Sequence, residues 1–249
     1  MEIADHIAAL RRDGLLLADA AAMHTLDEAV PTTPGWTVGD LLRHIGEVHR
    51  WAMSHVAQQR LTKMPTEEEQ ELTRNWPEGD DELLEWFSSG HEALVFSLET
   101  ADPGLRCWTF LPAPSPLAFW ARRQAHETAI HRVDAESVTG EITPIGAEFA
   151  ADGVDELLTC FFGRPGRLRG DPAYTLGLVA TDLPRAWRVS VGPTVVVTDG
   201  GEAADCVVTG TAEELYLLLW NRRDPAGLDV VGDEAVLTRW RDSAVVSWS

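Results

Sequence analysis

The residues best suited to chemistry lie in one stretch without glycine or proline, from Trp120 to Asp134, which predicts a single helix. Within it, Glu127 and His131 are four residues apart, so their side chains share one face. Carboxylates and imidazoles are common ligands of zinc and similar divalent ions. The pair is therefore half of a possible metal site, although such pairs are also ordinary contacts on a helix surface.

A third ligand has to come from another segment. His126 cannot complete a zinc-protease motif with His131, because the two are five residues apart and HExxH requires four. Our candidate is His44, which precedes Val48 by four residues on the apolar side of a helix expected over residues 38–60. The alternative for His44 is a core histidine that is hydrogen-bonded to a neighbour.

Asp134 follows His131 by about one turn of the same helix. At that spacing, a carboxylate can orient the imidazole of a metal ligand from behind. The alternative is an ordinary charge that faces solvent. The residue types leave both roles open.

The elements that must position these side chains form a helical half of the chain. Amphipathic patterns predict helices over residues 2–27, 38–60, 80–98 and 115–134, with a polar loop over residues 61–79. Amphipathic helices joined by connectors indicate a four-helix bundle, in which metal ligands come from facing helices. We therefore expect His44 to face the helix that carries Glu127 and His131.

A second domain is expected after a linker at residues 140–146. A further helix is predicted over residues 147–162. The apolar period then approaches two, which predicts strands at 174–180, 187–191, 194–198 and 204–209, the second and third forming a hairpin. A capping box of Thr211 with Glu214 opens a leucine-rich helix, and a last strand and helix are expected at 229–232 and 233–240. The fold class is α+β with two domains, residues 1–140 and 147–249.

The composition limits the partners. The 249 residues carry a formal net charge of −20, and such an acidic surface repels phosphate, which argues against nucleic acid and anionic membranes. Cys107, Cys160 and Cys206 are widely spaced and include no CxxC, which favours a reducing compartment over a disulfide framework. No run approaches the ~20 apolar residues of a membrane span. We expect a cytoplasmic protein, a monomer or small homo-oligomer, with small-molecule partners.

Residues 36–44, 122–134 and 208–222 carry a resemblance to a known family, and Val231-Gly232-Asp233 also fits. The chain resembles the mycothiol-dependent maleylpyruvate isomerase family, which belongs to the broader DinB-like metalloenzymes. The resemblance covers nearly the full length in the right order. It implies a DinB-like N-terminal four-helix bundle and a C-terminal domain similar to sterol-carrier folds. It also implies a divalent ion, usually zinc, held by His44, Glu127 and His131.

The resemblance further implies an arginine of the C-terminal domain that reaches the metal-site cleft. Its usual context in the family is Gly-Arg after the leucine-rich helix. This chain has Asn221-Arg222-Arg223 there, so Arg222 is the better match for the catalytic arginine and Arg223 is its rival. Such an arginine could hold a substrate carboxylate or stabilise an enolate.

The activity that the resemblance implies uses mycothiol as a cosubstrate. Three protein ligands leave open positions on the ion, and a thiol that enters one would lose its proton. The thiolate would add to a small electrophile. The outcome is either cis–trans isomerisation of a maleylpyruvate-like acid or, if the adduct is kept, S-transfer of the thiol to the substrate.

A hypothesis from a different class is a non-catalytic binding protein that carries an apolar ligand in its C-terminal domain. Four tryptophans could line such a pocket: Trp187, Trp220, Trp240 and Trp248. Aromatic packing in a core is the simpler explanation for them. A stoichiometric metal ion would favour the enzyme, and bound lipid without metal would favour the carrier.

Overall fold

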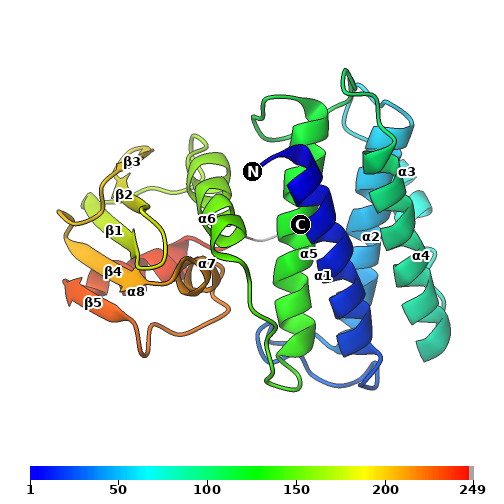
Figure 1. The fold of residues 1–249 in the computed structure, drawn as a ribbon, viewed down its shortest axis with the longest axis horizontal. Coiled ribbons are helices and arrows are strands. Elements are labelled where there is room, and N and C mark those ends of the chain that lie inside the picture. Colours follow the sequence, from blue (N-terminus) through cyan, green and yellow to red (C-terminus); the bar gives the residue numbers. More distant parts are fainter. Residues whose placement is uncertain (247–249) are drawn as a thin grey trace. The chain divides into compact units, whose positions relative to one another are not determined.

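The computed structural model describes residues 1–246 and divides the chain into two compact units, Met1–Thr143 and Pro144–Ser249 (Figure 1). The first unit is helical, and the second is built on a five-stranded sheet. The predicted fold class, a helical bundle followed by an α+β domain, is confirmed. Among the helices of residues 1–246, none combines the length and apolar character needed to cross a membrane.

Four long helices build the first unit: α1 (Ile3–Ala21), α2 (Val38–Ala57), α4 (Asp80–Glu99) and α5 (Pro116–Glu136). Helix α5 packs against α1 and α2, and α4 packs against the same two helices (Figure 1). The Thr37 and Ser115 side chains accept backbone hydrogen bonds and cap α2 and α5. One buried apolar cluster of the bundle contains Leu17, Val38, Leu41, Leu42, Ile45, Leu83 and Phe87. The cluster packs α1, α2 and α4 together, and the caps fix where the two helices that carry the candidate ligands begin.

The prediction of a loop throughout residues 61–79 is wrong, because this segment contains the short helix α3 (Thr66–Thr73). Three glutamates, Glu67, Glu68 and Glu69, occupy its first turn, where negative charge stabilises a helix N-terminus. Thr73 is the one buried residue of α3. The helix therefore has no apolar stripe from which a periodic pattern could be recognised.

The second unit opens with α6 (Ala147–Asp155), which continues as a wider π-helical segment, Glu156–Phe162. Its strands are β1 (Tyr174–Ala180), β2 (Ala186–Val191), β3 (Val195–Asp199), β4 (Cys206–Gly210) and β5 (Asp229–Gly232). They are ordered β3-β2-β1-β4-β5; β1 and β4 are parallel, and all other neighbours are antiparallel. Strands β2 and β3 form the predicted hairpin. Helices α7 (Ala212–Leu219) and α8 (Glu234–Ser243) contact β1 and β4.

Two further histidines, His49 and His91, are buried in the bundle and are not among the candidate ligands. His49 lies 2.8 Å from the Thr128 hydroxyl, and its ring centroid is 5.2 Å from that of His91. The His91 ring covers Gly14, where any Cβ would collide with it. Burial lowers the pKa of His91 to about 4 and holds the pKa of His49 well below its usual value. Both rings are therefore neutral at neutral pH.

Acid should destabilise the first unit because His91 resists protonation in the folded state. Its contribution to stability is complete above pH 6.5, the unfolded value, and is lost as the pH falls toward 4. At about 1.4 kcal/mol per pKa unit, this ring accounts for roughly 3 kcal/mol over that window. Urea unfolding at a series of pH values checks the slope. His91→Gln should flatten it, and an equally steep slope in that variant would contradict the assignment.

Candidate metal centre

His44 on α2 and Glu127 and His131 on α5 converge within the bundle. One potential ligand atom from each lies within 4.8 Å of the other two. Glu127 Oε1 is 3.5 Å from His44 Nε2 and 3.5 Å from His131 Nε2. The structure thus brings together the three residues that sequence analysis proposed from separate segments. Their donor atoms could hold one divalent ion.

Within the described part of the chain, two polar atoms of the three candidate ligands have no hydrogen-bond partner. Glu127 Oε1 and His44 Nε2 are buried, and within residues 1–246 neither has a hydrogen-bond partner. Leaving a buried polar group unpaired costs about 1–3 kcal/mol. A cation between them would satisfy both atoms. Two imidazoles and one carboxylate also match the ligands of catalytic zinc sites, which keep a position open.

Asp134 supports His131 from behind. Asp134 Oδ2 lies 2.9 Å from His131 Nδ1, and Asp134 Oδ1 accepts a hydrogen bond of 2.6 Å from the Thr32 hydroxyl. Asp134 is fully buried, so the alternative of a solvent-facing charge is wrong. The bonds to Asp134 fix the ring so that Nε2 faces the group.

The imidazoles of His44 and His131 have different pKa values because their surroundings differ. Burial opposes the charged form of His131, but Asp134 and Glu127 outweigh it and raise the pKa of His131 to about 9. Burial lowers the pKa of His44. Burial also acts to raise the pKa of Glu127, but His131, His44 and the Arg123 charge hold that pKa well below its usual range. Without an ion, the three candidate ligands are therefore a carboxylate (Glu127), an imidazolium (His131) and a neutral imidazole (His44).

Trp36 and Arg123 contact the group, and sequence analysis assigned neither of them a role. The Trp36 ring centroid lies 4.9 Å from that of His44 and 6.1 Å from that of His131, with which it stacks at 8°. Arg123 Nη2 donates to Glu127 Oε2 at 2.9 Å. The Arg123–Glu127 spacing of four residues was the one available signal, and it is common on helices.

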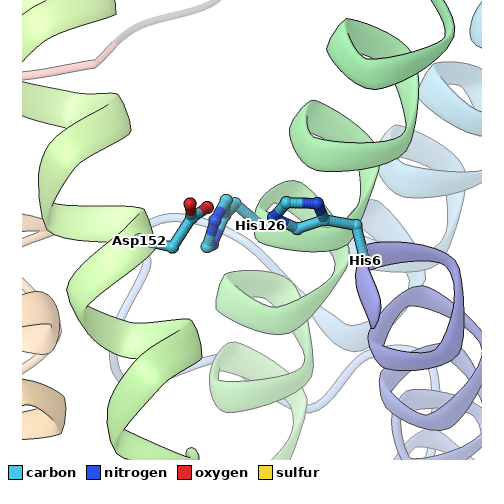
Figure 2. Close-up of side chains that lie close together, drawn as sticks. All are labelled: His6, His126 and Asp152. Atoms are coloured by element: carbon cyan, nitrogen blue, oxygen red, sulfur yellow. The ribbon is translucent and has the colours of Figure 1, made fainter. Parts of the chain in front are cut away.

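His126 belongs to a different part of the bundle. Its ring lies beside that of His6 on α1, with centroids 6.0 Å apart (Figure 2). Although it precedes Glu127 in sequence, it takes no part in the group formed by His44, Glu127 and His131. The expectation that His126 does not pair with His131 is consistent with this position.

In the second unit, Arg222 follows α7, and its Nη1 donates to the Trp220 carbonyl at 3.0 Å. The preceding Asn221 has φ of 56°, in the left-handed region that favours glycine. Asn221 therefore takes a backbone conformation that a Gly-Arg sequence would also allow. Arg223 makes an ion pair with Glu214 at 2.7 Å.

The tryptophans proposed for a carrier pocket are packed in the second unit. Trp187, Trp220 and Trp240 are buried. Trp187 Nε1 donates to Asp155 at 2.7 Å, and the Trp240 ring packs edge-on against Phe162. Core packing accounts for these three rings, and Trp248 lies outside the described residues.

The protein's own thiols are poorly suited to nucleophilic chemistry. Cys107, Cys160 and Cys206 are free and buried. Burial raises the pKa of Cys107 and of Cys206, which disfavours their thiolates. A reaction at the candidate centre that needs a thiolate would require a thiol from solution.

The Thr32–Asp134–His131 chain predicts a graded loss of zinc affinity. Asp134→Asn should weaken binding by roughly 10- to 100-fold, as is usual for a residue that orients a metal ligand. Thr32→Val should act in the same direction but less strongly. The control is Thr139→Ala, since the Thr139 hydroxyl donates to the Glu136 backbone carbonyl at the end of the same helix and to no member of this chain. Competition with a chromophoric chelator measures the zinc affinity of all three variants. If Asp134→Asn binds zinc as tightly as the wild type, Asp134 does not support His131.

The fold and the buried group define a two-domain protein whose helical bundle carries a candidate metal centre. The family model for the mycothiol maleylpyruvate isomerase N-terminal domain matches residues 7–136. The model for the C-terminal domain of the same proteins matches residues 148–239. The chain belongs to the mycothiol-dependent maleylpyruvate isomerase family.

Solved structures agree with this assignment at the level of the fold. The mycothiol-dependent maleylpyruvate isomerase is similar with a TM-score of 0.63 and 14% identity, over 92% of this chain and 93% of that one. A histidine-to-alanine mutant of the mycothiol-dependent maleylpyruvate isomerase gives a TM-score of 0.65 and 13% identity, with the same coverage. No protein with a curated description matches the sequence.

Proposed function

We propose that this protein is a zinc- and mycothiol-dependent enzyme that acts on a small electrophilic acid. The reaction is either cis–trans isomerisation of a maleylpyruvate-like acid or S-transfer, in which the whole thiol becomes attached to the acid through its sulfur. The observation that carries the proposal is the convergence of His44, Glu127 and His131, with Glu127 Oε1 and His44 Nε2 buried and unpaired. Membership of the family supports the choice of mycothiol as the thiol.

The candidate ligands have distinct tasks in this proposal. A divalent ion held by His44, Glu127 and His131 would lower the pKa of an entering thiol, so that its thiolate is available at neutral pH. Asp134 keeps the His131 ring in the orientation that binding requires. Trp36 restricts rotation of both imidazoles by packing against them.

Arg222 is our candidate for the group that holds the substrate. Its guanidinium can bind a carboxylate through two N–H bonds and stabilise charge that develops on an adjacent carbonyl oxygen. The left-handed conformation of Asn221 supports this choice. The choice of Arg222 is also supported by the ion pair between Arg223 and Glu214, because the side chain of the rival arginine already binds another residue.

The two outcomes share a first step and differ in the second. The thiolate sulfur bonds to one alkene carbon, and the electron pair of the double bond moves toward the conjugated carbonyl oxygen. Rotation about the resulting single bond, followed by expulsion of the thiolate, gives the trans isomer and regenerates the thiol. If the adduct takes up a proton from water instead, the product keeps the sulfur.

The test combines purified protein with zinc, mycothiol and maleylpyruvate as the cis-configured acid. We expect turnover that requires both zinc and mycothiol and stops when a chelator is added. A trans product with mycothiol unchanged identifies an isomerase, and a stable sulfur adduct identifies a transferase. If neither maleylpyruvate nor related electrophiles show any dependence on the thiol, the proposal is wrong.

We further propose that the protein acts in the cytoplasm as a monomer or small homo-oligomer. The three free, buried cysteines support a reducing compartment. The net charge of −20 supports small-molecule partners rather than nucleic acid or anionic membranes.

A further inference from the structure

The two carboxylate oxygens of Glu127 have different surroundings. Oε2 accepts a hydrogen bond of 2.9 Å from Arg123 Nη2, and both side chains are almost completely buried. Oε1 faces the imidazoles of His44 and His131 at 3.5 Å and, within residues 1–246, has no hydrogen-bond partner. Oε2 is thus held by a charged guanidinium, whereas Oε1 faces the two imidazole nitrogens without a hydrogen bond to any described residue.

The same helix contains a comparison pair with the same spacing. Arg132 and Glu136 are also buried and four residues apart. There, Glu136 Oε2 accepts from Arg132 and from the Thr143 backbone N–H, and Glu136 Oε1 accepts from the Thr143 hydroxyl. Both oxygens are occupied, so this pair is complete as a structural ion pair. The Arg123–Glu127 pair differs, because Glu127 Oε1 has no hydrogen-bond partner within residues 1–246.

We propose that Arg123 is a positioning residue that restricts Glu127 to a single ligand oxygen. The inference rests on the proposed metal-dependent function. A carboxylate can give one or both oxygens to a divalent ion, and the second oxygen would fill a position that an incoming thiol needs. A charge-assisted bond to a buried guanidinium is strong enough to hold Oε2 away from the ion.

Arg123 also sets the charge of the centre. Glu127 is the one carboxylate among the three candidate ligands, and the Arg123 cation balances it. With the imidazoles neutral and the Asp134 carboxylate bonded to His131, Arg123 leaves the loaded centre with a net positive charge, which favours an anionic sulfur and an acidic substrate. Loss of Arg123 would weaken this preference even if the ion stayed bound.

The test uses cobalt(II) in place of zinc, because its visible absorption is several-fold stronger at four-coordinate than at five- or six-coordinate sites. The wild-type protein should bind one cobalt ion per chain and show intense bands. Arg123→Met frees Glu127 Oε2, so it should keep the cobalt but lose several-fold in band intensity. Arg123→Lys, which retains a charged donor, should recover much of the wild-type intensity.

The matched control is Arg132→Met, which breaks the comparison pair on the same helix and should leave the cobalt bands unchanged. If Arg123→Met does not fold, Arg123→Gln removes the charge with a polar side chain and should also lose band intensity. Wild-type bands in the variant that folds would overturn this inference while leaving the metal centre in place. A wild-type protein that binds no cobalt would overturn both the inference and the proposed function.

Discussion

Replacement of His44 by alanine should remove the bound ion and, with it, the mycothiol-dependent activity. His44 is the single candidate ligand from α2, so its loss leaves Glu127 and His131 without a partner on the facing helix. Activity should fall by more than about 100-fold, the upper range for residues that merely support a ligand. The His44 side chain is 21% exposed, so its truncation should disturb the core little.

The control for this variant is His24→Ala. His24 belongs to the same unit but pairs with Glu28 and not with a candidate ligand. It should keep wild-type metal content and activity. Metal content, circular dichroism and turnover are measured on the same samples. A His44→Ala protein that is folded, metal-loaded and active would show that His44 is a core histidine and not a ligand.

The second large effect is expected at Arg222. Arg222→Ala should lower kcat/KM by about 100- to 1000-fold, the usual loss when a group that stabilises developing negative charge is removed. Zinc content and thermal stability should stay near wild type, because Arg222 belongs to the second unit and the candidate ligands to the first. Arg222→Lys should recover part of the activity, since it keeps the charge but loses the two-pronged contact.

Arg223→Ala is the matched comparison for Arg222→Ala. It breaks the partly exposed ion pair with Glu214, which should cost no more than about 1 kcal/mol. Its kcat/KM should change little. The reverse pattern, a large loss in Arg223→Ala and none in Arg222→Ala, would exchange the roles of the two arginines.

The sequence was sufficient for much of the fold because the periodic patterns are strong. The boundaries of β1 and β5 agree with prediction, and the capping box of Thr211 with Glu214 opens α7 as expected. The meeting of His44 with Glu127 and His131 could also be predicted, since an i,i+4 pair on one helix needs a facing helix to complete a site. Helix α3 was missed because it has no apolar face.

The surroundings of the ligands could not be predicted in the same way. Thr32 and Asp134 are 102 residues apart in sequence, and no local pattern pairs a loop hydroxyl with a helical carboxylate. Trp36 has the features of an ordinary packing residue until both imidazoles are placed beside it. The division of the two Glu127 oxygens depends on atomic positions that residue types do not encode.

The left-handed turn before Arg222 shows a further limit. The sequence revealed only that asparagine precedes Arg222 where the resemblance implied a glycine. The structure gives Asn221 φ of 56°, a conformation that asparagine tolerates better than most residues. Whether a substitution preserves such a turn depends on the backbone angle, and the residue type alone leaves that angle open.

The most direct measurement of the central claim is a zinc titration of chelator-stripped protein, with the Glu127→Ala variant alongside. The account predicts one tightly bound zinc ion per wild-type chain and none in a folded Glu127→Ala protein. A wild-type chain that takes up no zinc, or a variant that binds it equally well, would contradict the metal centre and the thiol chemistry proposed from it.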